Sequence, residues 1–143
     1  MSIWNQAPTV EELQGRARDT LIDHIGIEFT EVGENYLRAR MPVDRRTVQP
    51  AGILYGGASV VLAETLGSVA ASLCLKSADK ACVGLEINAN HVRSMSEGWA
   101  HGTARPLHIG GSTQLWEIRI EDGNEKLVCM SRLTMAVIDR PRN

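Results

Sequence analysis

The feature that most constrains this chain is a long apolar segment that contains a single charged residue. Glu64 is the only charged residue between Arg46 and Lys76, and it lies within an apolar run from about Ala58 to Leu75. A carboxylate on so apolar a helix is costly to bury unless it is paired, protonated or used in chemistry. The run also contains the small polar residues Ser59, Thr65, Ser68 and Ser72. These polar residues argue against a membrane span, so the run predicts a helix buried on nearly all sides of a soluble fold.

Two glycines stand where this helix is expected to begin. Gly56 and Gly57 close a segment that starts at Gln49 and contains Pro50 and Gly52. A helix N-terminus has free N–H groups and the positive end of the helix dipole. The sequence therefore places a possible oxyanion site a few turns from an isolated carboxylate, and these are two of the parts that an acyl-transfer enzyme requires.

The composition indicates one ordinary globular domain spanning residues 1–143. Hydrophobic residues make up 43% of the chain and charged residues 22%. The net charge of −2 and the pI near 6.1 argue against nucleic-acid binding through bulk positive charge. Aromatic residues are scarce, at 4%, so platforms for stacking bases are not expected either.

The cysteines and the short motifs narrow the class of protein further. Cys74, Cys82 and Cys129 are odd in number and lie in apolar contexts, which predicts reduced core residues of a cytoplasmic protein. No secretory signal opens the chain, and no group of side chains has metal-ligand spacing, so we expect no metal. The Gly-x-Ser-x-Gly motif of α/β-hydrolase thioesterases is absent as well.

The rest of the chain reads as one N-terminal helix and six strands. Thr9 and Glu12 form a capping-box pattern before a helix from about Val10 to His24, which Gly15 is expected to interrupt. Alternating patterns predict strands over 25–32, 36–41, 82–92, 99–105, 114–121 and 126–138.

Three details of this pattern are specific predictions. Within the strand over 82–92, one face is expected to carry Val83, Leu85, Ile87 and Ala89. The clearest hairpin turn is 122–125, in which Asp-Gly and Asn supply positive φ. The long segment 42–57 is typical of a functional loop. The element order predicts an α+β fold in which an antiparallel sheet wraps a long central helix.

This pattern resembles the hotdog fold, and its motifs resemble the small acyl-CoA thioesterases of the 4-hydroxybenzoyl-CoA thioesterase group. That group includes the 1,4-dihydroxy-2-naphthoyl-CoA thioesterases and the enterobactin proofreading thioesterases. The motifs that carry the resemblance are Met41–Pro50, Gly56–Ser59, Ala63–Ser68, Gly84–Arg93 and Pro106–Gly110. They occur in the family's order over nearly the whole chain.

The resemblance implies a dimer, usually paired into a tetramer, with active sites at the dimer interface. Glu64 would be the catalytic carboxylate, supplied by one subunit to a site shared with the other. The Gly56 N–H would bind the thioester oxygen, and Gln49 would position the nucleophile or the carbonyl. Ser68, one turn after Glu64, would orient the attacking water or the carboxylate.

The chain departs from the family pattern at two places. Tyr55 stands where the family has a histidine in Leu-His-Gly-Gly, and a tyrosine does not titrate near neutral pH. Tyr55 is either a packing aromatic at an interface or an active-site residue. Gly111 to Thr113 replaces a segment in which close relatives carry a basic residue, which weakens one expected phosphate contact.

By the same resemblance, a further set of residues is expected to contact the substrate or its coenzyme A. These residues are Gly57, Val83, Gly84, His91, Arg93, Arg105, His108 and Gly110. His91 and Arg93 are two apart and should share one face of a strand, where the alternative is a solvated polar edge. The same alternative holds for Arg105 and His108.

The predicted function is hydrolysis of an acyl-CoA thioester, with an aromatic or other bulky acyl group, in which Glu64 acts as nucleophile or general base. Coenzyme A is part of the substrate, so no cofactor is expected. Two alternatives stay open, and the first is a proofreading thioesterase acting on acyl carrier proteins. The second is an acyl-CoA-binding protein with low turnover, which Tyr55 favours.

Overall fold

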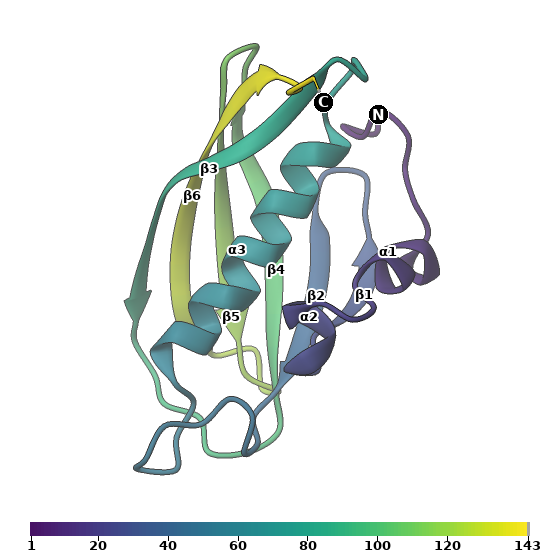
Figure 1. The fold of residues 1–143 in the computed structure, drawn as a ribbon. Coiled ribbons are helices and arrows are strands. Elements are labelled where there is room, and N and C mark those ends of the chain that lie inside the picture. The colour runs from purple at the N-terminus through teal and green to yellow at the C-terminus, as the bar shows by residue number, and fades with distance from the viewer. Residues whose placement is uncertain (143) are drawn as a thin grey trace.

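The computed structural model describes residues 1–142 and contains one antiparallel sheet packed on a long helix. The elements are α1 (Val10–Arg16), α2 (Leu21–His24), β1 (Glu28–Val32), β2 (Leu37–Pro42), α3 (Gly56–Leu73), β3 (Lys80–His91), β4 (Trp99–Ile109), β5 (Thr113–Glu121) and β6 (Leu127–Asp139). The strand order is β1-β2-β4-β5-β6-β3. Figure 1 shows the sheet curving around α3, with α1 and α2 on the β1–β2 side. The predicted α+β architecture is confirmed.

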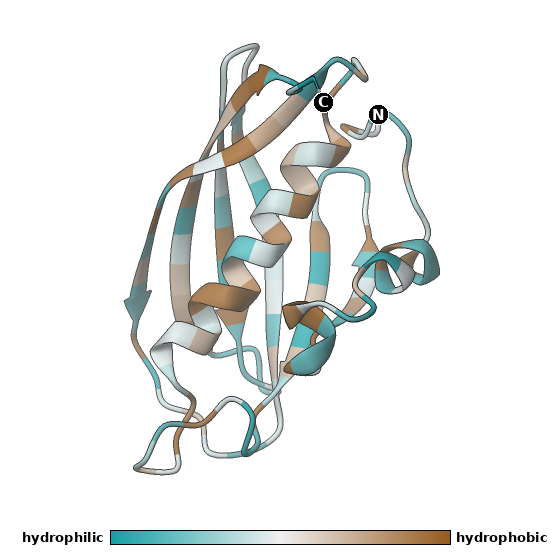
Figure 2. Ribbon diagram, viewed as in Figure 1, coloured by the Kyte–Doolittle hydropathy of each residue, from teal (hydrophilic) through white to brown (hydrophobic). Residues whose placement is uncertain are grey.

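The core lies between α3 and the concave face of the sheet. Leu62, Leu66 and Ala70 of α3 are fully buried, and so is Trp116 of β5. The strands contribute every second side chain to this core, and Figure 2 shows hydrophobic and hydrophilic residues alternating along β2. Inward residues of the strands therefore meet one stripe of the helix.

Two glycines set the close approach between α3 and the sheet. A Cβ on Gly67 of α3 would lie 2.6 Å from Leu133 Cδ2. A Cβ on Gly102 of β4 would lie 2.6 Å from Leu66 Cδ1. The helix and the sheet can therefore pack this closely only because both positions lack a side chain.

The opposite face of α3 is not covered, which corrects the expectation of a helix buried on nearly all sides. Only 39% of the helix residues are buried, because the sheet wraps one side only. By length and composition the helix could cross a membrane. In this structure it is the partly buried core helix on which the sheet packs.

The N-terminal helix begins as predicted and ends early. Thr9 Oγ1 accepts a hydrogen bond from the Glu12 N–H, and the Glu12 carboxylate accepts one from the Thr9 N–H, each at 3.1 Å. The chain then leaves the helix after Arg16, not at Gly15, and Asp19 has a φ of 61°. The predicted single helix is therefore two helices, α1 and α2, that meet at an angle.

A β-bulge in β3 makes one sequence prediction wrong. The register pairs Gly84 with Met135 and Ile87 with Leu133, so one extra residue stands between them on β3. Met135 and Leu133 both face the core. Val83 therefore lies on the opposite face from Ile87, and the four residues expected on one face are divided between two.

Two smaller predictions have different outcomes. In the hairpin 122–125, the positive φ of 62° belongs to Glu125, not to the Asp-Gly or Asn positions. The Asp122 carboxylate instead accepts the Asn124 and Lys126 N–H groups, and these bonds lower its pKa. The cysteines are free, as predicted, and burial raises the pKa of the Cys74 thiol to about 11.

Candidate functional site

The long loop before α3 is held in place by backbone bonds at both ends. The Tyr55 N–H donates to Thr47 O at 2.9 Å, and the Leu54 N–H donates to Met95 O at 2.7 Å. The buried Thr47 hydroxyl donates to Pro42 O at 2.6 Å. These bonds fix the point at which the chain enters α3.

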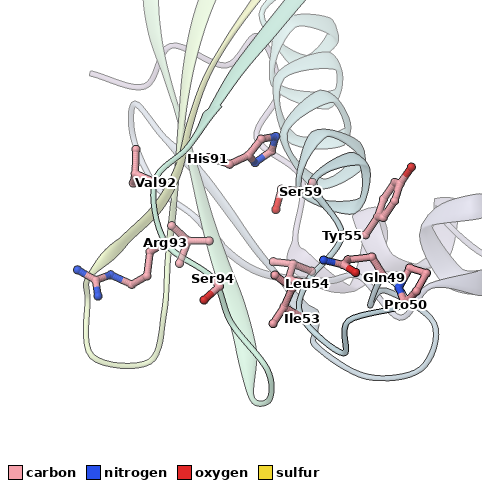
Figure 3. A pocket seen from close by; sticks show the side chains of 12 residues that line it. Gln49, Pro50, Ile53, Leu54, Tyr55, Ser59, His91, Val92, Arg93 and Ser94 are labelled. Atoms are coloured by element: carbon pink, nitrogen blue, oxygen red, sulfur yellow. The ribbon is translucent and has the colours of Figure 1, made fainter.

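The loop, the start of α3 and the end of β3 enclose a pocket of about 660 Å³. It is lined by Gln49, Pro50, Ile53, Leu54, Tyr55, Gly56, Ser59, His91, Val92, Arg93, Ser94 and Val128. Five residues predicted for the site from separate parts of the sequence line this pocket: Gln49, Tyr55, Gly56, His91 and Arg93. Figure 3 shows the His91 side chain beside the start of the helix and the Gln49 side chain below it.

Gln49 presents its amide nitrogen to this pocket. The Gln49 Oε1 accepts a hydrogen bond from the Ala51 N–H at 2.6 Å, and the Gln49 carbonyl accepts one from the Gly52 N–H. Gly52 has a φ of 83°, which glycine adopts without strain. Because the oxygen is already bound by the loop, the NH₂ group of Gln49 is the free donor, as Figure 3 shows.

The N-terminus of α3 is open to a ligand. Gly56 is the first helical residue and Tyr55 is the N-cap, whose side chain makes no capping hydrogen bond. The first N–H groups of a helix have no partner within it, so those of α3 are free to bind an oxyanion. His91 Nε2 lies 2.9 Å from the place that a Cβ on Gly56 would occupy, so the glycine allows the imidazole to approach the helix end.

Tyr55 lies at the mouth of the pocket. Its side chain is 55% exposed, and its ring occupies the space that a Cβ on Gly57 would need. Figure 3 shows the phenol pointing away from His91. Gly57 therefore serves the packing of Tyr55 as well as the turn into the helix.

Glu64 lies two turns further along α3, on the uncovered face. It is exposed and lines a second pocket, of about 420 Å³, with Leu21, Val60, Val61, Thr65 and Ser68. Its Oε1 lies 3.7 Å from the position of a Cβ on Gly84. Gly84 therefore leaves room for the carboxylate between α3 and β3.

Ser68 is next to Glu64 on the helix but is oriented inward. Its Oγ lies 3.9 Å from Met135 Sδ, a weak contact that leaves most of its hydrogen-bonding capacity free. Val83, by contrast, lies on the other face of β3 and is 43% exposed. The structure thus brings Glu64, Ser68 and Gly84 together and separates Val83 from them.

Three predicted coenzyme A residues lie apart from these pockets, and a fourth, Arg93, lines the first pocket but directs its side chain away from His91. Arg93 follows the end of β3, and Figure 3 shows it extending away from His91, so the prediction that the two share a strand face is wrong. Arg105, His108 and Gly110 lie toward the far end of β4, whose first residue is beside the loop. The Arg105 guanidinium stacks on the Tyr36 ring at 4.8 Å.

Sequence reasoning missed several residues of the two pockets. Ser59 is buried and lies one turn after Gly56, so the spacing of three could have indicated it. Leu21 and Val128 come from segments outside the motifs, and Ser94 directly follows one; only the fold brings them to the pockets. His24 and His101, the two remaining histidines, are exposed and lie outside both pockets.

A family model described as the thioesterase superfamily matches residues 51–129, which include α3 and the strands that pack on it. A Vibrio cholerae protein described only as a candidate esterase is 59% identical over 96% of this chain and 91% of its own length. The 1,4-dihydroxy-2-naphthoyl-CoA hydrolase of Escherichia coli is 49% identical, over 95% of this chain and 99% of its own. A proofreading thioesterase of Cronobacter turicensis is 48% identical, over 95% and 98%.

Solved structures agree with these relatives. A Haemophilus influenzae thioesterase superposes with a TM-score of 0.93 and 46% identity, over 96% of this chain and 95% of its own. A Pseudomonas aeruginosa thioesterase, solved with one glutamine changed to alanine, has a TM-score of 0.95 and 45% identity, over 97% and 100%. A Staphylococcus aureus protein with TM-scores of 0.80 and 0.78 and 32% identity was solved as a glutamate-to-alanine and as a glutamine-to-alanine variant, covering 84% and 82% of this chain and 99% and 97% of its own.

Proposed function

Because this chain belongs to the thioesterase superfamily and is a thioester hydrolase, we propose that it cleaves an acyl-CoA with an aromatic or other bulky acyl group to the free acid and coenzyme A. The observation that carries the proposal is the pairing of an open helix N-terminus at Gly56 with the solitary Glu64 carboxylate on the same helix. We place the activity in the cytoplasm, in keeping with the three free thiols.

Glu64 carries out the attack in this proposal. It either bonds directly to the thioester carbon and expels the coenzyme A thiolate, or it takes a proton from a water that attacks the same carbon. The apolar walls of its pocket, Leu21, Val60 and Val61, exclude water around the reacting carbon and strengthen electrostatic interactions there. Ser68 holds the water or the carboxylate.

Support for this assignment comes from the Staphylococcus aureus relative. Its mutated glutamine and glutamate are separated by the same number of positions as Gln49 and Glu64 here. The Gln49 NH₂ group and the Gly56 N–H are the donors available to the thioester oxygen. Two donors aimed at the developing oxyanion are the usual arrangement in acyl transfer.

One chain cannot supply all of these groups to one carbonyl. Gly56 and Glu64 are eight residues apart on α3, which is roughly 12 Å along a helix axis. Catalytic groups must come within hydrogen-bond distance of the reacting atoms. The site is therefore shared, with Glu64 from one subunit and the Gly56 end of α3 from another.

The edge of the sheet supports such a dimer. β3 is an edge strand of 12 residues, and its Val83 and Leu85 are exposed hydrophobic residues. Long, open, apolar edges normally pair or are covered. Two copies joined along β3 form a homodimer with a continuous sheet, and two such dimers can pair through the uncovered faces of α3 as a homotetramer.

Coenzyme A is bound in this proposal by the remaining predicted residues. His91 and Gly57 lie at the helix end, and Arg105, His108 and Gly110 come from the distant end of β4. In an assembly, that distant end belongs to a neighbouring subunit. Arg93 points outward, where it can meet the phosphates or an acyl carrier protein.

A second candidate rests on the exposed Tyr55 at the pocket mouth, which favours an acyl-CoA-binding protein with low turnover. The alternative among enzymes is a proofreading thioesterase that removes acyl groups from acyl carrier proteins. A panel of benzoyl-, naphthoyl- and alkanoyl-CoA, each compared with the same acyl group on a carrier protein, separates them when thiol release is followed. Rapid release from aroyl-CoA supports the proposal, and binding without release supports the second candidate.

A further inference from the structure

A small recess beside the Glu64 pocket has no role in the proposal so far. α1, α2, β1 and α3 enclose a space of about 280 Å³. Its apolar walls include Leu13, Ala17, Ile22, Phe29 and Leu73. This volume is near the lower end for ligand pockets, which suits a group of one or two rings and excludes a long folded chain.

The recess lies next to the Glu64 pocket along α3. Ser68 lines both spaces, Glu64 lines one and Ser72 lines the other. These three residues are four positions apart, so they share one face of the helix, each about 6 Å beyond the last. A rigid acyl group whose carbonyl carbon lies at Glu64 therefore reaches the recess with its far end.

The one-turn helix α2 borders both spaces. Leu21 lines the Glu64 pocket, and its neighbour Ile22 lines the recess. Figure 2 shows hydrophobic residues at the start of α2, on the side nearest α3. The position of α2 is thus suited to select acyl groups by shape.

Arg16 gives the recess a charge. It is the only charged residue among those that line it, and it lies in the last turn of α1. The ion pairs within residues 1–142 do not include Arg16. A guanidinium beside an apolar wall binds carboxylate and other oxygen acceptors through paired donors.

We propose that this recess holds the acyl group and that Arg16 selects acyl groups with an oxygen substituent, best a carboxylate, at the ring position farthest from the thioester. The inference rests on the proposed function and adds the part of the substrate that Glu64 and Gly56 do not define. Arg16 touches the distal substituent and takes no part in the chemical step.

The test compares kcat/KM for 4-carboxybenzoyl-CoA with kcat/KM for benzoyl-CoA. We expect the wild type to favour the carboxylated substrate, and Arg16→Met to lower this ratio about tenfold, as for loss of one charge-assisted hydrogen bond. Arg18→Met is the matched control, since Arg18 is exposed, is two residues away and does not line the recess. An unchanged ratio in Arg16→Met, with both substrates cleaved, overturns the inference and leaves the proposed function intact.

A second variant tests the position of the ring. Ser72 is exposed on α3, so Ser72→Phe should fold while filling the recess. We expect kcat/KM for 2-naphthoyl-CoA to fall at least tenfold relative to that for acetyl-CoA. Equal loss for both substrates would place the ring elsewhere.

A binding measurement tests the role of Arg16 without requiring that any substrate be hydrolysed. The wild type and Arg16→Met are titrated by calorimetry with a non-hydrolysable 4-carboxyphenacyl thioether of coenzyme A. Weaker binding by Arg16→Met, by about tenfold, supports the recess even if no acyl-CoA is cleaved. Equal binding by the two proteins contradicts it.

Discussion

Glu64 stands alone on the exposed face of α3, and its isolation makes it a clean target for substitution. Glu64→Gln keeps the shape of the side chain and removes both the nucleophile and the base. We expect the rate of thiol release from aroyl-CoA to fall by about 10²–10⁴-fold, as is usual when a general base is lost, with unchanged circular dichroism. Glu97→Gln, in an exposed turn, is the control. Retention of more than about a third of the activity by Glu64→Gln would show that another group attacks the thioester.

A substitution at Tyr55 is expected to raise the activity. An imidazole is smaller than a phenol and can donate from either nitrogen, so Tyr55→His should let the thioester lie closer to the Gly56 N–H. Because misplacement by about 1 Å can cost on the order of 10²-fold, we expect kcat to rise roughly tenfold or more. Steady-state kinetics with the best aroyl-CoA measures this.

Tyr55→Phe distinguishes the competing role of the tyrosine. If its hydroxyl already supplies a hydrogen bond that the reaction needs, Phe abolishes turnover and His lowers it. That result would make Tyr55 a working catalytic residue. With the ring exposed at the pocket mouth and turned away from His91, we expect Phe to behave much like the wild type.

At the scale of elements, two helical glycines, one packed against the sheet and one in open space, are expected to respond to alanine in opposite ways. Gly67→Ala places a methyl group 2.6 Å from Leu133 Cδ2, and overpacking of this kind destabilises by about 1–3 kcal/mol. Gly15→Ala in α1 meets nothing within 4 Å, so it should stabilise by about 0.5–1 kcal/mol. Urea unfolding at one fixed protein concentration measures both. Stabilisation by both changes would mean that α3 can move away from the sheet without loss.

Local patterns predicted the elements, and tertiary contacts decided their limits. The capping box and the alternation along β2 depend on neighbouring residues, so the sequence alone reveals them. The end of α1 does not, because the Gln14 side chain bonds Ile27 O and the Phe29 N–H and so ties α1 to β1. The bulge in β3 also cannot be predicted from neighbouring residues, because it depends on how β3 pairs with β6.

The candidate site likewise combines residues that local patterns predict with contacts that only the packing of the fold produces. Gln49, Gly56 and Glu64 were predicted because motifs and composition distinguish them. The approach of His91 to Gly56, and the recess beside Ser68, depend on how distant segments pack. No spacing in the sequence encodes them.

For the whole molecule, the distance between Gly56 and Glu64 predicts that activity requires assembly. We expect light scattering to show a dimer or tetramer at micromolar concentration. A fully active monomer would contradict the shared site. Dilution below the dissociation constant should reduce specific activity, because each site needs two chains.

Subunit mixing tests sharing directly. Glu64→Gln and Gly56→Pro should each be inactive; the backbone accepts proline at position 56 because it is the first helical residue, and the added ring displaces the His91 imidazole as well as removing the N–H. After exchange of equal amounts, half of the dimers are hybrids with one intact site, so about a quarter of wild-type activity should return. A site built from one chain would recover none.

The extra residue in β3 also decides which change of length the strand can accept. Leu85 stands unpaired between two paired neighbours, since Gly84 pairs with Met135 and Glu86 pairs with Thr134. Removing Leu85 would join these two pairs into a regular ladder and leave the face of every other residue unchanged. Removing a paired residue such as Val83 would instead turn the segment 80–82 over or slide it along β6. Related chains should therefore tolerate the loss of a residue at the bulge better than the loss of one within the segment before it.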